Sequence, residues 1–423
     1  MNFSFTNLAE IIYKLGPAMI NNNIAHLVVD ECYLGVPGTI FLFNTLRDMN
    51  SLEELYVDCE LDDGHGLVND LNDTSMAECI PSLATCTGMR KLMLNGLSFS
   101  ANSCAALRGV FPRMSALLEL RLGGNSIDDE CARALVQGLS DCKQIQSLSL
   151  SRNIISDDGL DVLILGLPTS VDMLDLGGNE ITLARQLPLL RFKKLHLTWN
   201  ALSHGGPGLI AKSLANHECR LESLTLNRCN IGNEGAAILA EGLGNNQRLI
   251  RMSLEDNNIT QEGLNAFSSI LCNPSSIDAS YNSNHTIHDM GGYGAYGANI
   301  PQDVEILLEL NSDPDKSRVA ANKILQVHRH LDMRPFFGME LDLLPYVVAW
   351  LERFAESRPE LKLSSIYEFV RAMPTKVTKG WGGRRRGRSV SSTVSVRVPR
   401  WIFPWVHVKH SVSRILGFSL CVN

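Results

Sequence analysis

One short stretch of the chain has the residue types of a phosphate-binding loop. Residues 206–213 read Gly-Pro-Gly-Leu-Ile-Ala-Lys-Ser and differ from the nucleotide P-loop, G-x-x-x-x-G-K-S, by an alanine at the second glycine. In a true P-loop, backbone N–H groups surround the phosphates and the lysine neutralises them. Here Leu202, Gly206, Ile210 and Leu214 follow a spacing of four that recurs along the chain. We therefore predict a packed helix and no bound nucleotide.

Other candidate chemical sites are equally weak. The segment 292–297 fits the dinucleotide fingerprint G-x-G-x-x-G, but no good strand directly precedes it, so we interpret 291–300 as a Gly-rich linker. His285 and His288 have no cysteine or acidic partner at metal-ligand spacing, and no G-x-S-x-G elbow occurs. We predict no enzyme activity, no catalytic residues, no metal, no cofactor and no small-molecule substrate.

The C-terminal segment has a composition that suits nucleic acid. No Asp or Glu follows Glu368, and the eleven Lys and Arg residues beyond it leave 27 basic and 45 acidic side chains before it. Arg384, Arg385, Arg386 and Arg388 stand among glycines and a tryptophan, a combination that can neutralise phosphates and stack on unpaired bases. The alternatives are a solubilising tail, a nuclear address, or, for 389–423, an extension of the reading frame foreign to the natural protein.

A repeated phrase decides the fold. The pattern Leu-x-x-Leu-x-Leu-x-x-Asn-x-Ile is clearest over residues 117–127, and its second anchor recurs ten times, mostly about 28 residues apart. Leucines at alternate positions predict short strands, and the spacing after each Asn predicts a helix. A single unit cannot bury its own apolar face, so stacked units must share one core. The second anchors are residues 27, 55, 92, 120, 148, 174, 195, 224, 252 and 277.

These patterns predict an α/β solenoid, a horseshoe with parallel inner strands and outer helices. We expect an N-terminal helical cap over 1–23, the repeat domain over 24–290, the linker over 291–300, a helical region over 301–373 and a basic, disordered tail over 374–423. Eleven cysteines without a C-x-x-C pair indicate buried thiols in a reducing compartment. With no secretory signal and no apolar run of about 18 residues, we expect no membrane association and a cytoplasmic location, with the nucleus as the alternative.

The strand positions between the leucines predict which side chains line the inner face, because neighbouring strand residues alternate between faces. This surface mixes acidic, aromatic and arginine side chains, the last two being the types that most often dominate protein interfaces. Its acidic end lies near Asp30, Glu31 and Asp58 and would recruit a basic partner. The residues that we predict to bind a partner are Tyr56, Arg121, Arg152, Asp175, His196, Trp199, Arg228, Asp256 and Tyr281. The alternative for Trp199 and the arginines is local packing and pairing with nearby acids.

The phrase and the 28-residue step resemble the ribonuclease-inhibitor-like class of leucine-rich repeats, also found in NOD-like receptor repeat domains and Ran GTPase-activating proteins. The likeness covers about residues 24–284, and the end of the repeat array with residues 317–325 and 365–370 is similar to diatom-type repeat proteins. The resemblance implies a non-enzymatic scaffold or adaptor that binds an unidentified protein on its concave face. Two alternatives remain: a GTPase-activating regulator of the Ran-activator type, and an RNA-associated protein that uses its Arg/Gly tail.

Overall fold

The computed structural model describes residues 1–4, 11–30, 32, 34–59, 71–184, 189–291 and 300–328. The chain divides into two compact units, Met1–Lys323 and Ile324–Asn423, and the first contains the repeats. Several predictions lie outside the described residues. These are the tail 374–423, most of the helical region 301–373, the interior of the linker 291–300, and Glu31.

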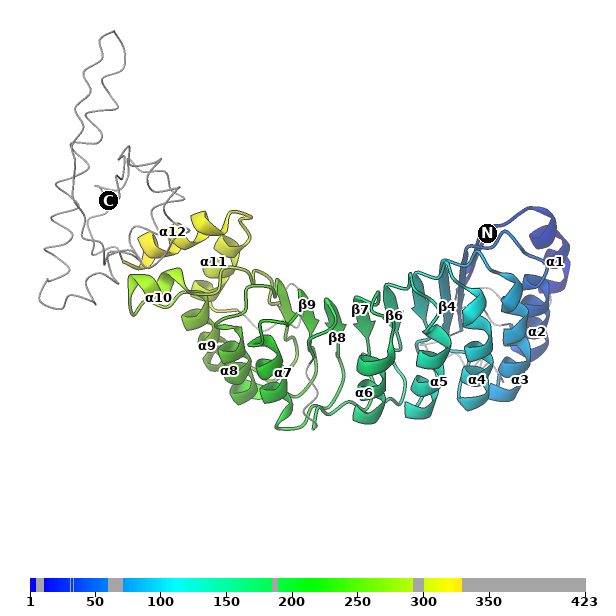
Figure 1. Cartoon of the computed structure of the whole chain (residues 1–423), viewed down its shortest axis with the longest axis horizontal. Coiled ribbons are helices and arrows are strands. Elements are labelled where there is room, and N and C mark those ends of the chain that lie inside the picture. Colours follow the sequence, from blue (N-terminus) through cyan, green and yellow to red (C-terminus); the bar gives the residue numbers. More distant parts are fainter. Residues whose placement is uncertain are drawn as a thin grey trace, which may run out of the picture. The chain divides into compact units, whose positions relative to one another are not determined.

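Ten strands form one parallel sheet in which spatial order follows chain order. Figure 1 shows the strands on one side of the repeat unit and the helices on the other. The predicted α/β solenoid is therefore confirmed. The strands are β1 Asn2–Ser4, β2 His26–Asp30, β3 Glu54–Asp58, β4 Lys91–Asn95, β5 Glu119–Arg121, β6 Ser147–Ser149, β7 Met173–Asp175, β8 Lys194–His196, β9 Ser223–Thr225 and β10 Arg251–Ser253.

The register of the sheet follows the repeat. Leu27 pairs with Leu55, Leu55 with Leu92, and the ladder continues through the anchors to Met252. The anchors are buried, whereas most of the residues between them are at least partly accessible, with Ser149 and Ser253 as buried exceptions. One face of every strand therefore supplies the shared core and leaves the opposite face available.

The helices pack on the buried side of the sheet. In α6, a Cβ on Gly159 would lie 2.6 Å from Cγ2 of Ile155. A larger residue at this position would therefore force the helix away from the segment that leads into it. The motif at 206–213 falls in α7, where Ser213 is buried and its hydroxyl donates to the Leu209 carbonyl. The helices are α1 Ile12–Asn21, α2 Gly35–Leu46, α3 Asp73–Cys79, α4 Ala101–Val110, α5 Asp129–Leu139, α6 Asp157–Gly166, α7 Gly206–Leu214, α8 Gly232–Leu243, α9 Gln261–Leu271, α10 Ile277–Tyr281, α11 Gln302–Asn311 and α12 Lys316–Val327, with 3₁₀ turns η1 Ile80–Thr85 and η2 Phe111–Arg113.

The asparagine of the repeated phrase joins neighbouring units. Asn153 donates from Nδ2 to the carbonyls of Leu122 and Leu150, and its Oδ1 accepts from the N–H of Ile127, each at 3.0 Å. At the same site of another unit, Cys229 donates its thiol to the Leu197 carbonyl at 3.1 Å. The ten cysteines within the described residues are buried, as predicted for structural thiols.

Both ends of the sheet differ from the prediction. The first strand is β1, which pairs with β2 in a region where only a helix was expected. The prediction that Ile277 anchors a strand was wrong, because residues 277–281 form α10, capped by the Ser276 hydroxyl. The chain returns to the sheet later, where Asp289 pairs in parallel with Arg251.

A buried lysine secures the end of the repeat array. Lys323 has no exposed surface, and its Nζ donates to the carbonyls of Leu271 and Asn284 and to Nδ1 of His285. Burial lowers the pKa of Lys323 to about 7. His285 in turn contacts the Tyr281 carbonyl through Nε2, and burial, with Lys323, lowers the pKa of His285 to about 4. These contacts give His285 a structural role.

Candidate protein-binding surface

The residues that directly follow the second anchors of β2 to β10 form one continuous row on the sheet face opposite the helices. The pairing registers align them as Val28, Tyr56, Met93, Arg121, Ser149, Asp175, His196, Thr225 and Ser253. Four residues predicted to bind a partner, Tyr56, Arg121, Asp175 and His196, therefore lie in this row.

Local contacts fix several of these side chains. Arg121 is exposed and paired with Glu119, with 2.6 Å between Nη2 and Oε1. Ser149 donates its hydroxyl to Asp175 at 2.8 Å. Burial lowers the pKa of His196, and the charge of Asp175 only partly opposes this effect. At neutral pH, His196 is therefore an uncharged hydrogen-bonding group on the face.

A second row lies where the strands end. In seven of the described repeats, the residue before the asparagine site has a left-handed backbone, with φ between 52° and 67°. This conformation costs a side-chain-bearing residue roughly 1–2 kcal/mol, whereas glycine adopts it freely. The turns that contain larger residues are therefore less stable, by this conformational energy, than the equivalent turns that contain glycine. Glycine stands at Gly96, Gly124 and Gly178, and larger residues at Arg152, Trp199, Arg228 and Asp256.

Trp199 and Arg228 form a stacked pair within this second row. Trp199 is 59% exposed, and the guanidinium carbon of Arg228 lies 4.2 Å from the centre of its ring. Asp256 accepts from Nε of Arg228 at 2.8 Å. Asn230 and Asn258 complete an open hollow beside the pair and also have left-handed backbones. Arg228 is thus paired with an acid, as the alternative interpretation holds, while Trp199 stays accessible.

Tyr281 does not join the other predicted residues. It belongs to α10 and not to a strand, so it has no place in either row. The other eight lie in the two rows, which run side by side along the sheet.

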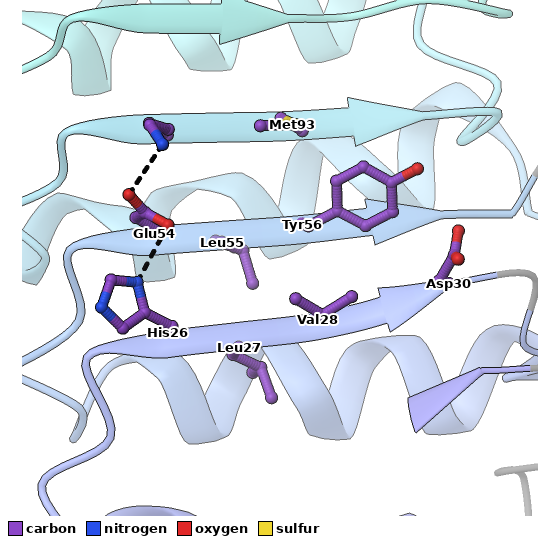
Figure 2. Close-up of a pocket in the computed structure, with 9 residues that line it drawn as sticks. His26, Leu27, Val28, Asp30, Glu54, Leu55, Tyr56 and Met93 are labelled. Carbon is purple, nitrogen blue, oxygen red and sulfur yellow. Dashed lines mark ion pairs between the residues drawn. The ribbon is translucent and has the colours of Figure 1, made fainter. Parts of the chain in front are cut away.

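A pocket at the N-terminal end of the sheet was not predicted from the sequence as a unit. It has a volume of about 200 Å³ and is lined by residues of β2, β3 and β4 (Figure 2). On one side, Glu54 pairs with His26 at 2.9 Å and with Lys91 at 3.0 Å. The sequence does place these three residues at equivalent positions, since each directly precedes a second anchor of the repeated phrase. Their contacts with one another, however, depend on the pairing register of the strands.

Tyr56 lies on the floor of this pocket, between Val28 and Met93 in the strand register. Its hydroxyl donates to Oδ2 of Asp58 at 3.1 Å, and Asn95 donates to the same oxygen at 3.0 Å. Burial raises the pKa of Tyr56 above its usual value, as do the negative charges of Asp58 and Asp30. The phenol therefore stays protonated and acts as a hydrogen-bond donor.

The described residues hold no group of three or more His, Cys, Asp or Glu side chains suited to a metal ion. In the same part of the chain, each helix is too short or too polar to cross a bilayer.

Comparisons with known proteins identify the class of repeat. A family model described as "Leucine Rich repeat" matches residues 219–240. Ribonuclease inhibitor from Sus scrofa is 27% identical over 291 residues, which cover 59% of this chain and 62% of the inhibitor. NACHT, LRR and PYD domains-containing protein 9C from Mus musculus is 25% identical over 272 residues, covering 58% of this chain and 25% of that protein. Among solved structures, the leucine-rich repeat-containing protein LegL7 from Legionella pneumophila has 17% identity and a TM-score of 0.43, covering 78% of this chain and 99% of LegL7.

The parallel strands, the asparagine contacts and the outer helices define a leucine-rich-repeat solenoid. This chain is a leucine-rich-repeat protein related in sequence to ribonuclease inhibitor and to the NACHT, LRR and PYD domains-containing proteins. It spans between 25% and 62% of the length of these two relatives.

Proposed function

We propose that this protein is a non-enzymatic scaffold or adaptor that binds another protein on the sheet face and the adjoining row of turns. The observation that carries the proposal is Trp199, a large aromatic residue that is 59% exposed in a left-handed turn. Three equivalent turns contain glycine, so the fold itself does not require a side chain there. Exposed apolar area held at an energetic cost is expected where a partner covers it.

The neighbours of Trp199 support the same function. Arg228 is already oriented by Asp256 and by the indole ring, so less side-chain freedom is lost when a partner binds. Tryptophan and arginine are the residue types most often found at energetically dominant interface positions. The name of one relative, ribonuclease inhibitor, also describes a protein that acts on another protein.

The test replaces Trp199 and Arg228 by glycine, the residue that nature places at equivalent turns. Glycine keeps the left-handed backbone, so the double variant should remain folded. Ser98→Gly is the matched control, because Ser98 is exposed and left-handed but lies in another turn. Proteins captured by the immobilised wild-type chain are identified, purified and measured for affinity against all three chains.

We expect the double variant to weaken binding to a true partner by roughly several hundred-fold, since two dominant interface residues contribute about 2 kcal/mol each and about 1.4 kcal/mol is a tenfold change in affinity. Ser98→Gly should bind like the wild type. Equal affinities for all three chains, with their folds verified by circular dichroism, would refute binding through these turns.

A further inference from the structure

We propose that the pocket over β2, β3 and β4 binds an arginine side chain of the partner protein. The inference rests on the proposed function and specifies what the N-terminal end of the same face recognises. It follows from the apolar floor of the pocket, the position of two carboxylates at one end, and the internal neutralisation of the charges at the other end.

The floor suits the aliphatic part of a long side chain. Val28, Tyr56 and Met93 are neighbours in the strand register, and all three are half-buried. Figure 2 shows them side by side on the accessible face of the sheet. At about 200 Å³ the pocket is smaller than the roughly 300–1,000 Å³ of typical small-molecule sites, which matches one side chain better than a cofactor.

Two carboxylates stand together beyond this floor. Asp30 and Asp58 are direct partners in the parallel register of β2 and β3, so their charges face each other across adjacent strands. Like charges directly opposite one another destabilise a sheet. Figure 2 places Asp30 beside the hydroxyl end of the Tyr56 ring. A cation bound there would relieve the repulsion and could also lie against the aromatic ring.

The other side of the pocket already has balanced charges. Glu54 is shared by His26 and Lys91, and these contacts hold its carboxylate in place. The Lys91 hydrogen bond lowers the pKa of Glu54, and His26 adds to this effect, although burial opposes it. The net negative charge of this surface therefore lies with Asp30, which lines the pocket, and with Asp58, its partner in the next strand, where the head of an incoming side chain arrives.

Arginine fits this arrangement better than lysine does. Its planar guanidinium can contact two carboxylates at once and stack on an aromatic face, while its methylene groups cover the apolar floor. A lysine ammonium is a more strongly hydrated point charge and lacks the planar face. We therefore expect arginine to bind more tightly than lysine.

The probe is a fluorescein-labelled hexa-arginine peptide, with hexa-lysine and hexa-citrulline peptides as comparisons. Citrulline keeps the shape of arginine but has no charge. Anisotropy titrations use the full-length wild-type chain, Asp30→Asn, Tyr56→Ala and the control Glu241→Gln, which removes one acidic charge from the helix side of the protein. Asp30→Asn preserves side-chain shape, so it also serves if Tyr56→Ala proves unstable.

We expect affinity to fall in the order arginine, lysine, citrulline, and Asp30→Asn and Tyr56→Ala to weaken hexa-arginine by roughly threefold to tenfold, about 1 kcal/mol each. Glu241→Gln should change it by less than about twofold, as for a distant charge screened by salt. Equal binding of arginine and citrulline peptides, or unchanged affinity in both pocket variants, would overturn the assignment. Either result would contradict the arginine site without contradicting the proposed function, because the proposed function is tested by the partner affinity of the Trp199→Gly, Arg228→Gly double variant. The two proposals can therefore be refuted independently.

Discussion

Replacing Asn153 by alanine should remove a group of hydrogen bonds that connects two neighbouring repeats. Asn153 is 6% exposed, and alanine leaves the carbonyls of Leu122 and Leu150 and the N–H of Ile127 without their present partner. Each intramolecular hydrogen bond contributes roughly 1 kcal/mol net, and a buried group left unsatisfied costs roughly 1–3 kcal/mol. We therefore expect the variant to lose at least about 3 kcal/mol of unfolding free energy.

Urea unfolding followed by far-UV circular dichroism measures this loss. Asn153→Cys should lose less than Asn153→Ala, because the thiol of Cys229 donates to two carbonyls at the equivalent site. Asn102→Ala is the control, since Asn102 is exposed in α4 and alanine is the better helix former. The reasoning fails if Asn153→Ala costs less than about 1 kcal/mol, or if cysteine and alanine are equally damaging at this site.

Two further predictions concern packing and pH. The pKa of Lys323 is lowered by burial from 10.5 to about 7, so the folded chain binds fewer protons than the unfolded chain between these values. The stability of the wild type should therefore rise from pH 7 to pH 10. Thermal melts of Lys323→Met should show a smaller rise. An identical rise in the two chains would contradict a lowered pKa of Lys323. Gly242→Ala should lower the free energy of unfolding, measured in urea, by about 1–3 kcal/mol, because the new Cβ would lie 2.6 Å from Cα of Ala211. This loss is expected although alanine favours helices. Unchanged stability would mean that α7 and α8 separate easily.

Most of the fold was predictable because the repeated phrase encodes a local and a neighbouring contact at the same time. Leu120, for example, predicts both the strand alternation within its unit and the buried pairing with Leu92 and Leu148. The face of each strand then follows from the alternation alone. This is why Tyr56 and His196 were placed correctly in one row before their register was known.

The ends of the array could not be predicted in the same way. Around Ile277 the phrase was present in weakened form, but the Ser276 hydroxyl caps a helix there. The strand position passes to Asp289, and Asn284 supplies the buried contacts by donating to the carbonyls of Leu243 and Asn246. These contacts depend on the preceding repeat, so they carry no spacing signal of their own.

The ion pairs between repeats likewise could not be predicted from the sequence. Arg228 and Asp256 are 28 residues apart, yet they meet because equivalent turns of adjacent repeats lie side by side. Sequence spacing identified both as surface residues but left open whether arginine faced a partner or a neighbouring acid. The structure shows a contact with Asp256 and with Trp199 together.

The two proposed contact regions set the size of the partner. Tyr56 lies in β3 and Trp199 follows β8, five strands further along the sheet, so they are separated by about 24 Å at a spacing of roughly 4.8 Å per strand. A single side chain cannot reach both, whereas a folded domain, or an extended segment of about seven residues, can span that distance. Because the regions share no contacts, their contributions to the binding of one partner should be nearly additive. A partner with an arginine near one edge of its interface and an apolar hollow about 24 Å away therefore matches this surface best.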